Sequence, residues 1–525
     1  MSQSLIVVAA IAAIVVVTVF ITALSRRVGW SAPILLVAIG AIVSYIPAVP
    51  RVVIEPEVIL YGLLPPLLFA AAIRTSYVDV RARRDPILLL SVGLVAFTVV
   101  VVGFTAWLIV PALTLAAGFA FGAVVAPTDA VAVIAITRRA RLPRGLATLL
   151  EGESLLNDAT SLVALNAAIA AIVSIVNPWT VAGDFALEVV GGVLVGLSVG
   201  FVLAAVRRRL KAPVLDTSLS LATPFIAVVL AQLIHGSGIL AVVIAGLYLG
   251  YRSPRIQSAE SRIAESLNWR TIQFLLENAV FLFIGLNLSR VVEGAAHSGI
   301  GFWQAVLICV IVLAVLLVSR WLWSVLLTVI YLWGPKRLRR PSWSFGQTIP
   351  ASLAGIRGVV TLAAAFLLPE QTPNREFLQL LAFVVVVGTL LQGLTLPLVI
   401  RRLSLPRPNF DQERTEVHNL MAEAQAAGLA RLDEEATDDV AERVLQRLRT
   451  NATFLAESIE NESADAESLH SAYARLRRIT IKAERAAVLA ARHEGRYQEP
   501  AVKAVLGMID AEESAIRAMT RGDDD

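Results

Sequence analysis

The chain has 525 residues, of which 57% are hydrophobic and 16% are charged, with a mean hydropathy of +0.73 and a net charge of +4. About a quarter of the residues of a soluble domain are charged, so this composition excludes a soluble globular protein and indicates a polytopic membrane protein. The charge is uneven: 27 basic and 17 acidic residues precede Arg401, against 18 basic and 24 acidic residues from there on. This distribution fits membrane topology better than nucleic-acid binding.

The predicted membrane segments occupy the first 400 residues. Since a helix needs about 20 mostly apolar residues to cross a bilayer, the sequence predicts thirteen spans, at 4–25, 30–48, 57–74, 86–110, 112–137, 146–176, 183–206, 215–234, 237–251, 271–289, 303–333, 346–368 and 376–400. The first run is too long for a signal sequence and has no basic leader, so no cleavable signal peptide is expected. The single cysteine, Cys309, lies inside a span, so neither a disulfide framework nor a metal cluster is expected.

The connections between the segments carry an alternating charge. Arginine and lysine cluster after every odd-numbered segment, as in Arg26-Arg27 after the first and Arg207 to Lys211 after the seventh. The other connections carry at most one basic residue each. Because positive loops lie in the cytoplasm, we expect a multi-pass cell-membrane protein with its N-terminus outside and its C-terminus in the cytoplasm.

The composition changes after Pro406 and Pro408, where the chain becomes rich in Ala, Glu, Arg and Leu. Apolar residues recur there at helical spacing. The sequence thus predicts a transmembrane domain over residues 1–403 and a soluble helical tail of regulatory function over residues 404–525. The alternative is a partly disordered acidic tail.

The fifth segment contains a proline followed by two polar residues, Pro127-Thr128-Asp129. Pro127 removes a backbone donor and breaks the helix, which frees carbonyl groups at about residues 124–126. Unwound carbonyls in mid-membrane are typical of ion sites in transporters. The alternative is a simple proline kink.

The sixth segment carries several polar side chains: Glu153, Ser154, Asn157 and Asp158. Ser154 and Asp158 share a helix face, and Asp158 lies about 18 Å along the helix from Leu146, near mid-bilayer. A charged group at that depth costs about 3 kcal/mol, which indicates a function. Thr128 lies at a similar depth, so Thr128, Ser154 and Asp158 together form a candidate site for a small monovalent cation.

Such a carboxylate can hold either of two ligands. Burial favours its protonated form, whereas a bound cation favours its ionised form. Competition between proton and cation, combined with alternating access, is the mechanism of an exchanger.

Arg357, between two glycines of the twelfth segment, is a second charge within the membrane. An unpaired guanidinium is costly there, and Glu153 is the expected partner. The alternatives are pairing with Asp158 and snorkelling to the cytoplasmic surface. Glu277 in the tenth segment is either a structural group or part of the ion route.

Four motifs together resemble the monovalent cation/proton antiporter family, in the branch of the NhaP-type and sodium/proton exchangers: Leu64-Pro-Pro-Leu-Leu-Phe69, Ala126-Pro-Thr-Asp129, Gly152-Glu-Ser-Leu-Leu-Asn-Asp158 and Gly355-Ile-Arg-Gly358. The resemblance covers about residues 4–402. It implies an all-α polytopic membrane fold with inverted repeats and crossed broken helices, a mobile core that moves like an elevator, and a homodimer.

The resemblance also implies residue roles. Asp158 would bind the ion and the proton, with Thr128 and Ser154 as cation ligands. Asn157 and Asp129 would shape the site, and Glu153 would pair with Arg357. An Asn-Asp pair implies electroneutral one-for-one exchange. Na⁺ is the expected cation, with K⁺ and Li⁺ as alternatives, and no cofactor is expected.

One position departs from the family pattern. Many relatives carry an acidic residue directly after the Pro-Pro-Leu-Leu-Phe run, where this chain has Ala70. The choice between Na⁺ and K⁺ therefore stays open. Two other classes remain as alternatives: a channel or sensor that signals through its tail, and an intramembrane aspartyl protease, whose Tyr-Asp and Gly-x-Gly-Asp contexts this sequence lacks.

Overall fold

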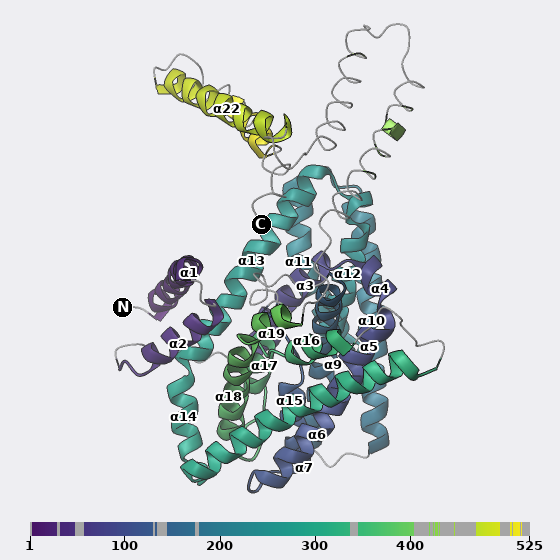
Figure 1. Ribbon diagram of the computed structural model, residues 1–525, viewed down its shortest axis with the longest axis vertical. Coiled ribbons are helices and arrows are strands. Elements are labelled where there is room, and N and C mark those ends of the chain that lie inside the picture. The colour runs from purple at the N-terminus through teal and green to yellow at the C-terminus, as the bar shows by residue number, and fades with distance from the viewer. Residues whose placement is uncertain are drawn as a thin grey trace. The chain divides into compact units, whose positions relative to one another are not determined.

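The computed structural model describes residues 3–28, 32–47, 57–129, 132–133, 144–173, 178–335, 345–403 and 469–493, together with scattered positions between 419 and 516. Its contacts divide the chain into two units, Met1–Pro408 and Asn409–Asp525. Every regular element within the described ranges is a helix (Figure 1).

The first unit contains helices and two short π-helical stretches. In chain order they are α1 (Gln3–Val28), α2 (Ala32–Ser44), η1 (Val58–Leu63), α3 (Leu64–Arg74), α4 (Tyr77–Ala82), α5 (Arg84–Leu88), η2 (Leu89–Gly93), α6 (Leu94–Ile109), α7 (Leu115–Val125), α9 (Arg144–Val173), α10 (Pro178–Arg207), α11 (Pro213–Leu233), α12 (Gly238–Ile256), α13 (Ala259–Leu286), α14 (Leu288–Ala296), α15 (Phe302–Trp333), α16 (Phe345–Leu353), α17 (Val359–Phe366), α18 (Arg375–Gly393) and α19 (Leu396–Arg402).

These helices account for the predicted spans. Eight helical stretches of the described residues are long and apolar enough to cross a bilayer, and four shorter apolar helices occupy the first, second, third and fifth predicted segments. The twelfth segment is the broken pair α16 and α17. The expected all-α membrane fold is confirmed.

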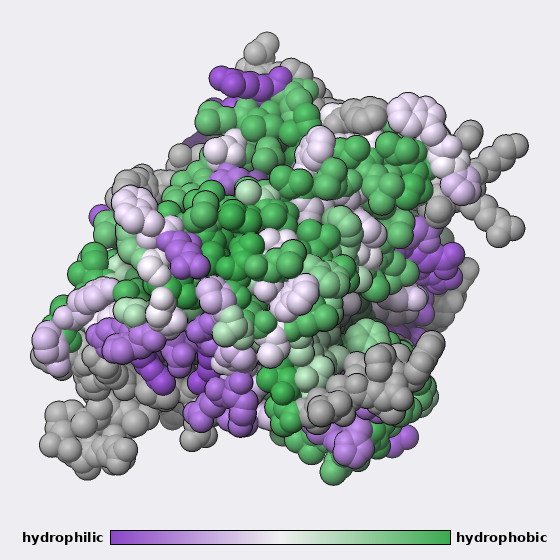
Figure 2. All heavy atoms as spheres, turned by 90° about the horizontal axis from the view of Figure 1, so that it is seen from below, coloured by the Kyte–Doolittle hydropathy of each residue, from purple (hydrophilic) through white to green (hydrophobic). Residues whose placement is uncertain are grey.

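The outer surface of this unit is hydrophobic. Figure 2 shows one face on which apolar side chains predominate. Along α15, Trp303 is 80% exposed, and Leu307 and Trp321 are also more than half exposed. Apolar patches of this size are rare on soluble monomers, so these side chains face lipid.

Two membrane helices are interrupted at positions where the sequence contains proline or glycine. Thr114 caps the start of α7 by accepting a hydrogen bond from the backbone N–H of Ala117 (3.2 Å). The helix then ends at Val125, two residues before Pro127, because proline cannot donate the next helical hydrogen bond. The second break lies between α16 and α17, over residues 354–358, where Gly355 and Gly358 weaken the helix.

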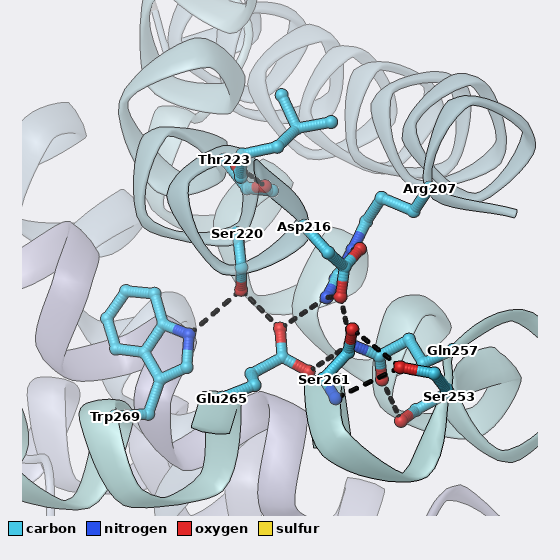
Figure 3. A network of polar contacts seen from close by, with 11 residues as sticks. Arg207, Asp216, Ser220, Thr223, Ser253, Gln257, Ser261, Glu265 and Trp269 are labelled. Atoms are coloured by element: carbon cyan, nitrogen blue, oxygen red, sulfur yellow. Dashed lines mark hydrogen bonds and ion pairs between the residues drawn. The ribbon is translucent and has the colours of Figure 1, made fainter. Parts of the chain in front are cut away.

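A buried ionic network joins the ends of α10, α11, α12 and α13 (Figure 3). Arg207 donates to both carboxylate oxygens of Asp216 (2.7 and 3.1 Å) and to Glu265 (2.7 Å). Gln257 donates to the same two carboxylates (2.7 and 2.9 Å), and the hydroxyl of Ser220 donates to Glu265. We call Arg207, Asp216, Ser220, Gln257 and Glu265 the scaffold network.

The second unit contains α22 (Leu469–His493), which packs Ile481 against Ile509 and Ile516. Two arginines of α22 bind acidic residues of the following helical positions. Arg477 donates to Glu512 (2.7 Å) and Arg485 donates to Asp510 (2.7 Å). The Arg477 guanidinium lowers the pKa of the Glu512 carboxyl. The rest of the predicted tail lies largely outside the described residues.

Candidate functional site

The two broken helices meet at their breaks. The backbone N–H of Asp129 donates to the carbonyl of Ile356 (2.7 Å). The approach is so close that a Cβ atom at Gly358 would lie 2.0 Å from a carboxylate oxygen of Asp129. Only glycine fits at this crossing, which accounts for the Gly-Ile-Arg-Gly sequence and confirms the expected crossing of broken helices.

Polar side chains of α9 tie this helix to the first break. Asn157 donates through Nδ2 to the hydroxyl of Thr128 (2.8 Å), and that hydroxyl donates to Glu153 (3.0 Å). All three residues are buried. The chain Asn157–Thr128–Glu153 thus fixes the position of the threonine oxygen against the face of α9.

Glu153 pairs with a different arginine from the one expected. Arg320 of α15 donates from both terminal nitrogens to the two carboxylate oxygens of Glu153 (2.6 and 3.1 Å), and through Nε to the carbonyl of Ala351 (3.1 Å). Both charged side chains are 1% exposed. A bidentate arginine–carboxylate pair is the strongest geometry available to either group. It corrects the prediction that Glu153 pairs with Arg357.

Arg357 binds backbone carbonyls instead. Its Nε donates to the carbonyl of Val125 (3.0 Å), and Nη1 donates to that of Gly355. Within the described part of the chain its guanidinium forms no ion pair. The carbonyl that Pro127 frees at the end of α7 is therefore occupied by Arg357. Since Arg357 is 1% exposed, snorkelling is wrong as well, and Arg357 acts as a clamp between the two breaks.

Asp158 differs from its neighbours because no arginine of the described ranges reaches it. It is 8% exposed, and among the described residues its carboxylate forms no ion pair and receives no hydrogen bond. Asp129 is the charged group that acts on it most strongly. Beside it, Oδ1 of Asn157 is buried and has no hydrogen-bond partner in the part of the chain that the structure describes. A carboxylate and an amide oxygen in this condition are the ligand types that a hard cation takes.

The structure brings several of the predicted residues together at the first break. Thr128, Glu153 and Asn157 are in direct hydrogen-bonded contact, and Asp129 lies within electrostatic range of Asp158. Ser154 is partly buried on the same helix, one turn before Asp158.

Arg320 and the scaffold network did not emerge from the sequence analysis. The signal for Arg320 was available, since a lone arginine stands near the middle of the apolar run 303–333. The network residues stand at the ends of predicted segments, where charged residues are ordinary, so composition alone does not distinguish them.

The membrane part of the chain matches the family model described as "Sodium/hydrogen exchanger, transmembrane" over residues 13–402. A relative from Mycobacterium tuberculosis, an uncharacterised Na⁺/H⁺ exchanger, is 31% identical over 523 residues, which are 97% of this chain and 95% of that protein. The sodium, potassium, lithium and rubidium/H⁺ antiporter of Bacillus pumilus is 33% identical over 388 residues, covering 70% of this chain and 57% of that protein.

A solved structure shows the same fold. It is that of the sodium proton antiporter MjNhaP1 from Methanocaldococcus jannaschii, which superposes with a TM-score of 0.63 over 77% of this chain and 99% of that chain. The two sequences are 18% identical over this region, so the likeness concerns the fold alone.

Proposed function

The chain belongs to the sodium/hydrogen exchanger family, and we propose that Asp158 is the carboxylate at which its two transported ions compete. As a member of that family it is a multi-pass membrane transporter and not an enzyme, and it exchanges a monovalent cation for protons. The observation that carries the proposal is that Asp158 forms no ion pair with any residue that the structure describes, while Glu153 beside it is neutralised by Arg320.

The neighbouring residues suit the two states of this carboxylate. With a cation bound, the ionised Asp158 and the oxygens of Thr128, Ser154 and Asn157 would replace part of its hydration shell. With the cation gone, protonation removes the cost of a buried charge. Because a single unpaired carboxylate takes either one proton or one monovalent cation, we propose electroneutral one-for-one exchange.

The crossing of the breaks supports an alternating-access mechanism. Glu153–Arg320 and Arg357 fix α9, α15 and the two breaks to one another, so these elements would move as one body. We propose that this body moves in an elevator-like way against the other helices, and that two copies of the chain form a homodimer. The N-terminus would lie outside and the C-terminal tail, with a regulatory role, in the cytoplasm.

The test is exchange by the purified full chain in proteoliposomes. Asp158→Asn is expected to abolish cation-driven proton flux while the protein still folds, because an amide neither ionises nor takes up the proton. The matched control is Asp184→Asn, an exposed carboxylate of α10, which is expected to transport like the wild type. Proton flux at the wild-type rate in Asp158→Asn would contradict the proposal.

The same assay answers the choice of ion. The Bacillus pumilus relative is named for transport of sodium, potassium, lithium and rubidium, so all four cations are compared, with Na⁺ expected to be exchanged. An imposed voltage is expected to leave the rate unchanged. A rate that follows the voltage would contradict electroneutral exchange.

A further inference from the structure

A line of three polar side chains runs between α3 and α13, outside the site described above. Arg74, the last residue of α3, is exposed and donates from Nη1 to the side-chain oxygen of Gln273 (2.9 Å). Gln273 is buried and donates through Nε2 to Oε1 of Glu277, one turn further along α13 (2.7 Å). The line therefore begins at the surface and ends at a carboxylate inside the membrane unit.

Glu277 is linked to the site by electrostatics, through Asp129. The charges that act on its carboxylate are those of Asp129, at the first break, and of Arg74. Asp129 in turn acts on Asp158. Three carboxylates, at the break after α7, on α9 and on α13, thus act on one another in sequence, and Arg74 is the positive charge at the outer end.

Glu277 is not explained as a member of a buried ion pair. Within the described residues no arginine or lysine lies in salt-bridge range of its carboxylate, unlike Glu153, Asp216 and Glu265. Among the described residues, Arg74 is the positive charge linked to it, through the Gln273 amide. The Gln273 side chain accepts a hydrogen bond from Arg74 and donates one to Glu277, but as a neutral amide it does not cancel the negative charge of Glu277. Glu277 therefore keeps most of its attraction for a cation.

We propose that Arg74, Gln273 and Glu277 set the strength with which the transporter draws a monovalent cation towards Asp158. The carboxylate of Glu277 attracts the cation, and the guanidinium of Arg74 opposes that attraction. Gln273 is the positioning residue that holds these two groups at a fixed separation. The inference rests on exchange at Asp158, since it concerns the route to that carboxylate.

The experiment measures initial rates of proton flux against Na⁺ concentration for the full chain in proteoliposomes of neutral lipid. Arg74→Gln is expected to lower the KM for Na⁺ roughly fivefold at unchanged kcat, which corresponds to ~1 kcal/mol. Glu277→Gln is expected to raise the KM. Both effects shrink when choline chloride raises the ionic strength, because salt screens the charges.

The matched control is Arg81→Gln, on α4. Arg81 is exposed, follows Arg74 closely in the sequence and carries the same charge, and its KM is expected to equal that of the wild type. The decisive arm is Arg74→Gln in the Glu277→Gln background, where the KM is expected to change clearly less than in the wild-type background, because Arg74 then acts on Glu151 but no longer on Glu277. If Glu277→Gln does not fold, Gln273→Met takes its place, since it breaks the link between the two charges.

A purely structural tie between α3 and α13 gives a different result. It would change melting temperature and kcat but leave the KM of Arg74→Gln equal to that of Arg81→Gln, and that outcome overturns the inference. An unchanged effect of Arg74→Gln in the second background overturns it too. Exchange retained by Asp158→Asn would instead contradict the proposed function, so the two failures are distinct.

Discussion

Two clusters of charge in this membrane unit have the same excess of carboxylates over arginines but differ in how their carboxylates are hydrogen-bonded. The scaffold network sets Asp216 and Glu265 against Arg207, and the site sets Asp129, Glu153 and Asp158 against Arg320 and Arg357. Each has one carboxylate more than it has arginines. In the network every carboxylate oxygen accepts a hydrogen bond, whereas Asp158 accepts none among the described residues.

The difference shows that excess charge alone does not mark an ion site. In the scaffold network, Gln257, Ser220 and the guanidinium supply at least one donor to each carboxylate oxygen (Figure 3), so no oxygen is left without a partner. In the site the arginines are drawn away from Asp158, one to Glu153 and the other to backbone carbonyls.

The largest effect is expected where one arginine serves two acids. Arg207→Met leaves Asp216 and Glu265 buried without a cation, and removing one partner of a buried ion pair costs about 3–5 kcal/mol. A marked fall in melting temperature in detergent is expected, with the KM for Na⁺ unchanged in the protein that folds. Arg209→Met, at an exposed neighbouring position, is the control. A raised KM would assign the network to transport and break the comparison.

Arg320→Met is expected to have the next largest effect, because it strands a single acid. Loss of the bidentate pair leaves Glu153 buried and charged, at a cost of up to about 3–5 kcal/mol. Adding Glu153→Gln removes that charge and is expected to recover part of the melting temperature. A double variant less stable than Arg320→Met alone would show that Glu153 and Arg320 are not each other's principal partners.

The fold was largely accessible from the sequence for a physical reason. In a bilayer the length of an apolar run and the alternation of loop charge are imposed by the solvent, so thirteen segments could be predicted and all correspond to helices. The breaks were accessible too, since Pro127 and the Gly355–Gly358 motif leave few alternatives. Asp158 stood out because a carboxylate in an apolar helix is costly.

The pairing inside the site could not be predicted to the same degree. Glu153 had two arginines within reach in three dimensions, and the distance between Glu153 and Arg320 along the sequence gives no indication of contact. Choosing between Arg320 and Arg357 requires the crossing geometry, because Gly355 and Gly358 bring Arg357 against the carbonyl of Val125. Only three-dimensional packing determines which arginine pairs with which carboxylate.

Arg357→Met is expected to have a smaller effect on stability than Arg320→Met. Its guanidinium donates to neutral carbonyls, so its loss leaves unsatisfied acceptors at about 1–3 kcal/mol rather than a stranded charge. The fall in melting temperature measured in detergent is expected to lie between those of Arg320→Met and the control Arg209→Met. A fall that exceeds the Arg320→Met value would favour an ion pair for Arg357 and against the carbonyl clamp.

The smallest effect is expected at the half-buried arginines of α22, Arg477 and Arg485, which sharpen the contrast with the fully buried ones. Because Arg477 lowers the pKa of Glu512, this carboxyl stabilises the helix pair above its unfolded pKa, and the stabilisation is lost as the pH falls through the lower folded pKa. Hydrogen-exchange protection of residues 469–493 is therefore expected to decline below about pH 4.5. Glu512→Gln is expected to remove that contribution, and Lys482→Gln to preserve it.

High salt is expected to weaken the Glu512 contribution while leaving the Arg207→Met destabilisation in place. If salt weakened the Arg207→Met destabilisation as much as the Glu512 contribution, burial would not be what distinguishes the two ion pairs.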